Sequence, residues 1–324
     1  MLVLPHGDGR AGTAVEKHVT QIPRILCAVD FSEPARAAFE QALALSRART
    51  AELTVVHAVP KDRPFAWHAR ERIDLTARLK QSATAAGVRL TVSVQHGDPA
   101  GVILLHARAR RPHLLVIGSH RRTGLARLRA GSVGETVALN APCAVLVVPA
   151  AAPGAVVQAP MVFGNIVCAV DFSRASKAAL LHAEALASES NGRLTLVHVE
   201  KGISPVDLSR YRYHLRVPTS RAPGAADAWR RLQNVSVALR GSGRVHARVL
   251  TGDPSTEIVR VATDTNADLI VVGVTPRGAI GRRVFSATAI RVMRTAGRPV
   301  LAVPAAARRR AGSPSDMNSM APAA

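Results

Sequence analysis

The sequence predicts an α/β protein built from two tandem, doubly wound domains, each with a five-stranded parallel sheet. Three observations support this prediction: a duplicated set of sequence blocks, an alternation of apolar strands with helices, and a length of 324 residues. A chain of that length accommodates two ordinary domains, each with its own core. Hydrophobic residues make up 48% of the chain, as is usual for a soluble globular protein.

Five sequence blocks occur twice in the same order, which indicates a duplicated unit of roughly 140 residues. The blocks are ILCAVDFS (25–32) and IVCAVDFS (166–173), LTVVHA (53–58) and LTLVHV (194–199), HGDPA (96–100) and TGDPS (251–255), HLLVIGSH (113–120) and DLIVVGVT (268–275), and CAVLVVPA (143–150) and RPVLAVPA (298–305). We place the domains at 20–150 and 164–305, an uncharged linker with Pro and Gly at 151–163, and a tail at 306–324. The tail is poor in large apolar residues and is expected to be disordered.

The first repeat begins with a largely apolar strand at 24–30 and a helix at about 34–50. Ser32 is a candidate N-cap, and Glu33 and Pro34 suit the first turn. One face of this helix is apolar at helical spacing in both repeats. It consists of Ala38, Phe39, Ala42, Leu45 and Ser46, and in the second repeat of Ala179, Leu180, Ala183, Leu186 and Ala187.

The remaining elements alternate in the same way. Strands are expected at 53–59, 89–95, 113–118 and 144–148, helices at about 65–86, 99–109 and 132–140, and a basic loop at 119–130. Strands that are apolar on both faces and alternate with helices indicate a parallel sheet covered on both sides. Right-handed crossovers make such a sheet doubly wound. The second repeat carries an insert at 202–226, which predicts a longer crossover.

The last strand of each repeat, AVLVVP or PVLAVP, is expected at a sheet edge. An apolar edge strand tends to pair with another strand. Two such edges in one chain predict an intramolecular pseudo-twofold dimer of the two domains.

Composition limits the partners and the compartment. The net charge of +21 favours anionic partners, but the basic residues are scattered and aromatics are only 3%, so nucleic acid is an unlikely ligand. No apolar run approaches the ~18 residues of a membrane span, and the apolar N-terminal stretch is too short for a signal peptide, so we expect a cytoplasmic protein without a membrane partner. Cys27 and Cys168 occupy matching apolar strands and are expected to be buried. No CxxC pair or Cys/His cluster indicates a metal site.

In an open parallel sheet, ligands bind at the carboxyl ends of the strands, where the winding direction reverses. Asp30 ends the first strand, and Asp171 ends its twin. A carboxylate at that place either accepts hydrogen bonds from ribose hydroxyls or caps the following turn, and both roles stay open. Gly118 ends the fourth strand, and Gly131-Ser132 opens the next helix. Backbone N–H groups at such a turn and helix N-terminus form an anion site.

These blocks together resemble the universal stress protein family. The resemblance covers both repeats and rests on the VDFS strand end, the LTVVH block, the GDPA turn, the IGSHRRTGLARLRAGSVGE loop and the VLVVP strand. It implies a tandem-domain, UspA-like protein with sheets in the order 3-2-1-4-5, a Rossmann-like fold related to adenine-nucleotide alpha-hydrolases. ATP-binding members share the loop pattern G-x2-G-x9-G-[ST].

The resemblance assigns nucleotide-binding roles to residues of the first repeat. Asp30 would contact the ribose and the backbone of Ala58 the adenine. The loop pattern places the remaining roles at Gly118, Gly131, Ser132 and, by the same match, Val133. Arg121 stands where the pattern has its middle glycine, and its guanidinium either obstructs the phosphate path or contacts a phosphate. His57 is expected to pack at its strand end rather than take part in chemistry.

The second repeat departs further from the pattern. It keeps Asp171 and Gly273, and Val199 occupies the place of Ala58. Pro276 replaces the middle glycine, and Ser286-Ala287 replaces the final Gly-Ser, which removes a donor N–H and a hydroxyl. We therefore expect a degenerate second site that has lost strong ATP binding and serves for scaffolding, pairing or regulation.

The expected function is that of a cytoplasmic stress sensor or effector that binds ATP, with Mg²⁺ alongside, mainly in the first domain. Binding would order the loop at 119–131 and change the surface offered to a protein partner. No nucleophile with a base, no HExxH motif and no P-loop lysine indicates an enzyme, although slow ATP hydrolysis stays open. The alternative is a nucleotide-free structural module that serves a protein partner, and a weaker third hypothesis is nonspecific nucleic-acid binding.

Overall fold

Two copies of the same run of strands and helices form the described part of the protein. The computed structural model describes residues 22–30, 32–60, 69–119, 133–150, 163–200, 225–239, 244–275 and 283–305. The first repeat contains β1 (Arg24–Val29), α2 (Glu33–Ala48), β2 (Glu52–Val59), α3 (Ala69–Ala85), β3 (Leu90–His96), α4 (Pro99–Arg110), β4 (Leu114–Ser119), α5 (Val133–Asn140) and β5 (Ala144–Pro149). The second contains β6 (Asn165–Ala169), α6 (Arg174–Glu189), β7 (Arg193–Glu200), α8 (Ala225–Ala238), β8 (Arg244–Thr251), α9 (Pro254–Asp264), β9 (Leu269–Val274), α10 (Arg283–Thr295) and β10 (Val300–Pro304).

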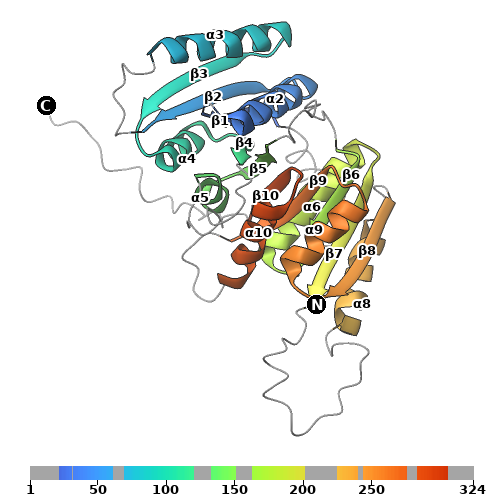
Figure 1. Ribbon diagram of the computed structural model, residues 1–324. Helices are drawn as coiled ribbons and strands as arrows, with labels where there is room; N and C mark the ends of the chain where they lie inside the picture. Colours follow the sequence, from blue (N-terminus) through green and yellow to red (C-terminus); the bar gives the residue numbers. More distant parts are fainter. Residues whose placement is uncertain are drawn as a thin grey trace, which may run out of the picture.

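The strands form one ten-stranded sheet in the order β3-β2-β1-β4-β5-β10-β9-β6-β7-β8 (Figure 1). Within each repeat the strands are parallel and follow the order 3-2-1-4-5, as the family resemblance implies. The two repeats meet where β5 and β10 pair antiparallel, with Leu146 opposite Leu301. The prediction that the two last strands pair with each other is therefore confirmed, and the two predicted sheets are halves of one continuous sheet.

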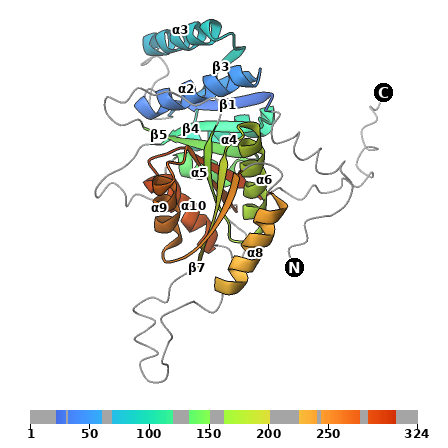
Figure 2. The same ribbon diagram turned by 90° about the vertical axis from the view of Figure 1, so that its right-hand side faces the viewer.

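Helices cover both faces of this sheet. The core on one face includes side chains of α2, α3, α6 and α8, and the core on the other face includes side chains of α4, α5, α9 and α10. Figure 2 shows the second repeat from the side, with α6 and α8 on one flank and α9 and α10 on the other. On each face, the buried side chains of the two repeats are in contact, because the β5–β10 pairing makes both faces continuous.

The helix starts follow the sequence signals. The Ser32 side chain caps α2 by accepting a hydrogen bond from the backbone N–H of Ala35 at 3.3 Å, and Ser173 caps α6 in the same way. The predicted N-cap is confirmed. Every member of the apolar faces predicted for these two helices is buried, at 9% exposure or less. These faces pack α2 and α6 against the central strands of their repeats.

Several predicted segments lie outside the described residues. They are residues 65–68 of the second predicted helix, nearly all of the basic loop and of the linker, most of the insert, and the tail. The structure places the start of α8 at Ala225, so the last residues of the predicted insert are already helical. Among the described helices, none combines the length and the apolar character that a membrane crossing requires.

The three cysteines provide a test of the packed core. Cys27 and Cys168 are fully buried, as predicted, and burial raises the pKa of both thiols, that of Cys168 to about 12. Burial likewise raises the pKa of Cys143 to about 12. Because the thiolate is the reactive form, we expect native protein at pH 8 to resist Ellman's reagent and guanidinium-unfolded protein to release all three thiols. Fast reaction of one thiol in the native protein would contradict this packing.

Candidate functional site

The carboxyl ends of β1, β2 and β4 lie side by side at one edge of the first repeat. Across β1 and β2, Val29 is aligned with His57, and across β1 and β4, Ala28 is aligned with Ile117. The residues that follow at this edge are three of the predicted site residues: Asp30, Ala58 and Gly118. From β1 the chain winds outward to β2 and β3 on one side, whereas β4 and β5 lie on the other. This edge is therefore the point of reversal at which open α/β sheets bind ligands.

The start of α5 lies over the end of β4. A Cβ placed on Gly134 would lie 3.8 Å from the carbonyl oxygen of Gly118. Val133, which opens α5, is 37% exposed beside it. The structure thus brings together Asp30, Ala58, Gly118 and Val133. The other predicted residues of this site, Arg121, Gly131 and Ser132, lie outside the described residues.

The Asp30 carboxylate holds the turn that leads into α2. Its Oδ1 accepts hydrogen bonds from the backbone N–H of Ser32, at 3.0 Å, and from the Ser32 hydroxyl. Ser32 in turn caps the helix. The capping role considered for Asp30 is therefore present in the structure. Asp30 is also exposed at the ligand edge, so this turn presents a carboxylate to solvent beside Ala58.

Gly118 has a packing role that sequence reasoning missed. A Cβ at this position would lie 2.5 Å from the carbonyl carbon and oxygen of Pro34 and 2.8 Å from the backbone nitrogen of Ala35. Real side chains do not approach backbone atoms so closely, so β4 can pass the first turn of α2 only because residue 118 is glycine. The loop pattern assigns this glycine to nucleotide binding, whereas the crossing of β4 and α2 requires it for packing.

The second repeat repeats this close approach. A Cβ on Gly273 would lie 2.6 Å from the backbone nitrogen of Ser176 and 2.7 Å from the carbonyl oxygen of Ala175, in the first turn of α6. Gly273 is thus retained although the loop after it has lost the nucleotide pattern. A glycine at this strand end is therefore evidence for the fold and not, by itself, for a phosphate.

The histidines of the LTVVH and LTLVH blocks are structural, as expected. His57 is 6% exposed, and its Nδ1 lies 2.9 Å from the carbonyl oxygen of Val29. His198 has the same contact with Val170 at 2.6 Å. Each ring joins the end of the second strand to the end of the first, and so helps to hold the edge on which the ligand residues lie.

The second repeat presents a different edge. Asp171 accepts a hydrogen bond from the Ser173 backbone N–H at 2.9 Å, and Val199 and Gly273 end their strands beside it. Ser286 and Ala287 fall within α10 rather than before it, and nothing is described of the Ser286 side chain. Pro276 lies outside the described residues.

An aromatic side chain packs over this second edge. Phe172, directly after Asp171, has a φ of 62°, which is rare for a bulky residue. Its ring centroid lies 4.9 Å from that of His198, and the Arg231 guanidinium of α8 lies 4.0 Å above the Phe172 ring. His198 also contacts Glu200 at 3.2 Å. This stack was not predicted, because the VDFS motif is the same in both repeats.

An arginine of the second repeat neutralises a buried carboxylate near the start of α5. Glu135, in the first turn of α5, has a side chain only 7% exposed. Arg294 of α10 donates two hydrogen bonds to its carboxylate, at 2.6 and 2.7 Å. The pKa of Arg294 is raised, first by this hydrogen bonding. The buried anion therefore has a fixed counter-ion. No group of described histidines, cysteines and carboxylates could hold a metal ion.

The fold and this edge define a tandem α/β protein whose first repeat brings candidate ligand residues together where the winding of the sheet reverses. The chain belongs to the universal stress protein family: the family model matches residues 21–149 and again 163–304. Recognition of the family from the repeated motifs is thereby confirmed.

Individual relatives match one repeat at a time. The chain is 28% identical over 144 residues to universal stress protein YxiE of Bacillus subtilis, a match that covers 39% of this chain and 97% of that protein. It is 31% identical over 136 residues to a putative universal stress protein of Staphylococcus epidermidis, covering 38% and 82%. The crystal structure of a universal stress protein from Archaeoglobus fulgidus matches both repeats, with a TM-score of 0.66 at 19% identity over 88% of this chain and 99% of that one. This last similarity shows the shared fold.

Proposed function

We propose that this protein is a cytoplasmic stress sensor or effector that binds ATP in its first repeat, and that its second repeat is a scaffold. One observation carries the proposal: Asp30, Ala58, Gly118 and Val133 lie together at the edge where the winding of the sheet reverses. Family membership supports the same ligand class. Binding rather than catalysis is the proposed activity, with at most slow hydrolysis of ATP.

In this proposal, the family resemblance gives each of these residues a part of an adenine nucleotide to contact. The exposed Asp30 carboxylate would accept hydrogen bonds from the ribose hydroxyls, and the backbone at Ala58 would meet the adenine. The start of α5 would face the phosphates, because the N–H groups at a helix N-terminus attract anions. Glu135 would oppose this attraction if it were unpaired, but Arg294 holds its carboxylate. Mg²⁺ would arrive with the nucleotide and neutralise phosphate charge.

In the second repeat, a side-chain stack lies at the corresponding edge. The Phe172 ring and the Arg231 guanidinium occupy the side of the edge next to Asp171. A ligand there would have to displace this stack. We therefore propose a division of roles in which the first repeat responds to nucleotide, the loop at 119–131 transmits the response to a protein partner, and the second repeat supplies the paired edge strand and Arg294.

The Asp30→Ala substitution tests the ribose contact. We expect it to weaken ATP binding, measured by titration calorimetry, by about 10-fold or more, because a hydrogen bond to a charged group contributes about 1.5–3 kcal/mol. The matched control is Asp171→Ala, which removes the same turn carboxylate from the second repeat and should leave the affinity unchanged.

Circular dichroism should show native secondary structure for both variants. Equal loss of affinity in the two would contradict the division between the repeats. The absence of heat and of a thermal shift for the unmodified protein at millimolar ATP would favour the nucleotide-free scaffold instead.

A further inference from the structure

The outermost strand of the second repeat, β8, carries a row of basic side chains. It lies at the end of the ten-stranded sheet, and its exposed residues include Arg244, His246 and Arg248 at every second position. Successive side chains alternate between the faces of a strand, so these three share one face. Arg193 of β7 is aligned with Arg244 and lies on the same face. Four basic residues thus gather on the amino-terminal part of β7 and on β8, away from the carboxyl edge of the sheet.

The first repeat is neutral at the matching positions. The aligned LTVVH and GDPA blocks pair Arg193, Arg244, His246 and Arg248 with Glu52, Arg89, Thr91 and Ser93. Glu52 and Arg89 form an ion pair at 3.2 Å, whereas their counterparts are two arginines on aligned positions. Like charges on neighbouring strands destabilise a sheet. The second repeat has therefore replaced a compensated pair with a repulsive one.

The helix that covers this face, α4 in the first repeat and α9 in the second, also differs in the polar contacts it makes with the outermost strand. In the first repeat, His106 of α4 contacts Gln95 at 3.0 Å and Ser93 at 3.5 Å, so the polar side chains of β3 have partners within the fold. The matching position of α9 is Val261, which is fully buried and offers no polar group. Among the described residues, no side chain of α9 forms a hydrogen bond with a side chain of β8.

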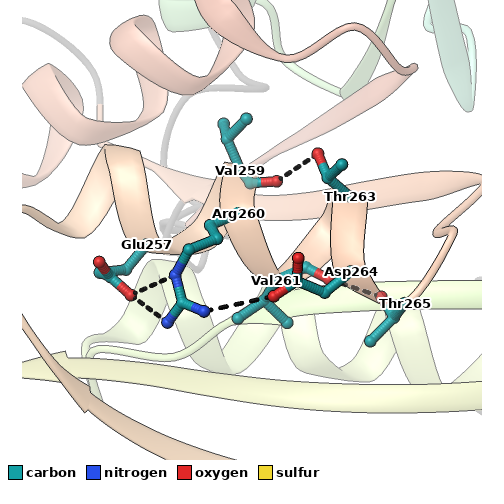
Figure 3. A network of polar contacts seen from close by, with 7 residues as sticks. All are labelled: Glu257, Val259, Arg260, Val261, Thr263, Asp264 and Thr265. Atoms are coloured by element: carbon teal, nitrogen blue, oxygen red, sulfur yellow. Dashed lines mark hydrogen bonds and ion pairs between the residues drawn. The ribbon is translucent and has the colours of Figure 1, made fainter.

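The carboxylates of α9 do not neutralise the basic row. Glu257 accepts hydrogen bonds from Arg260 at 2.6 and 3.0 Å, and Asp264 accepts one at 3.2 Å (Figure 3). Both acids are thus engaged on the surface of their own helix. Within the described part of the chain, none of the three arginines of the row forms an ion pair. An anion from outside the chain is the partner that this face lacks.

A cavity of about 490 Å³ opens at this face, and its volume suits a small ligand. Arg193, Thr195, His246 and Arg248 line it from this face, and Gln233 and Ser236 line it from α8, which packs on the other face beside the outermost strand β8. The Thr195 residue is only 3% exposed. Guanidinium, hydroxyl and amide donors around one cavity are the groups that bind phosphate oxygens. No described carboxylate, phenylalanine, tyrosine or tryptophan side chain lines it.

We propose that this cavity binds a small phosphate-bearing anion, such as a phosphomonoester or a diphosphate, at a site separate from the proposed nucleotide edge. A concave site of this size without aromatic platforms fits a compact anion better than a nucleic-acid strand, which requires a longer basic track and stacking surfaces. Comparison of the two repeats supports this proposal, because the side chains at these positions carry no net charge in the first repeat and are basic in the second.

Titration calorimetry of the full chain with sodium pyrophosphate tests the site. The informative variant combines Arg193→Glu, His246→Thr and Arg248→Ser, which installs the residues that the first repeat carries in the same fold. We expect it to bind pyrophosphate at least 10-fold more weakly than the unmodified protein, and Thr195→Val to bind several-fold more weakly. Arg230→Ser, an exposed arginine of α8 outside the cavity, is the matched control and should bind as the unmodified protein does.

The triple variant should bind ATP as tightly as the unmodified protein does, which separates this site from the proposed ATP site. Absence of pyrophosphate binding by the unmodified protein at 10 mM, or equal binding by the triple variant, would overturn the proposal. A single-stranded oligonucleotide that binds more tightly than pyrophosphate, with binding lost in the triple variant, would also overturn it and identify nucleic acid as the occupant.

Thermal unfolding gives a second readout. Without ligand, Arg193→Glu should raise the Tm by about 1–3 °C, because it replaces like charges with an opposite pair. Pyrophosphate should raise the Tm of the unmodified protein but not that of the triple variant. A lower Tm of unliganded Arg193→Glu would contradict the claim that the arginines are uncompensated.

Discussion

The Gly118→Ala substitution is expected to lower the free energy of unfolding by about 2–3 kcal/mol, as for other overpacked sites. The added methyl group would lie 2.5 Å from the carbonyl of Pro34, and backbone atoms of a helix turn cannot move aside as a side chain can. Either β4 or the first turn of α2 must shift. Urea unfolding followed by circular dichroism measures the effect.

Gly134→Ala provides the matched control, because it adds the same methyl group a short distance away. There the nearest atom of another element is 3.8 Å distant, which is an ordinary contact, and residue 134 lies within α5. Alanine favours a helix over glycine, so this variant should be as stable as the unmodified protein or more stable by about 0.5 kcal/mol. Equal destabilisation by the two substitutions would contradict the packing role of Gly118.

This result bears on how ATP binding by such variants is interpreted. The turn that Gly118→Ala would displace also carries Ser32, which holds the Asp30 carboxylate. Weaker ATP binding by Gly118→Ala would therefore not demonstrate a contact between Gly118 and a phosphate. Asp30→Ala, which leaves the strand packing intact, is the cleaner probe of the ligand edge.

The sequence was sufficient for the architecture, because duplication presents every element twice. A strand or helix that is ambiguous in one copy is clear in the other, and the two apolar last strands predicted the β5–β10 pairing. The position of the site followed from the same argument, since Asp30, Ala58 and Gly118 end strands that neighbour one another. Alignment of the repeats does not, however, predict which other residues each side chain contacts.

Three features show this limit. The need for glycine at position 118 depends on how closely α2 crosses β4, which no local pattern encodes. Phe172 belongs to a VDFS motif that both repeats share, and only the position of Arg231 on α8 identifies its stack. Glu135 and Arg294 lie at positions that do not correspond between the repeats, so the comparison of one copy with the other gave no sign of their pairing.

The Arg294→Ala substitution is expected to destabilise the protein by about 2–4 kcal/mol, because it removes the guanidinium that both oxygens of the buried Glu135 carboxylate bind. The Glu135 side chain is 7% exposed, and both of its oxygens bind the guanidinium. The lower end of the range reflects the partial exposure of Arg294, which lets water reach one side of the pair. Chemical unfolding at pH 7 measures the loss.

Arg291→Ala is the matched control from the same helix. Arg291 pairs with Asp253 at 2.9 Å, but the two side chains are 64% and 44% exposed. An exposed pair contributes about 0–1 kcal/mol, so the free energy of unfolding of this variant should remain close to that of the unmodified protein.

Because Glu135 lies in α5 and Arg294 in α10, loss of their ion pair acts on the junction of the two repeats. Combining Glu135→Leu with Arg294→Met should restore much of the stability, since a buried pair can be replaced by apolar side chains at little cost. If Arg294→Ala were as mild as Arg291→Ala, the charge of Glu135 would have another stabilising partner, and the role assigned to the second repeat in supporting the start of α5 would be wrong.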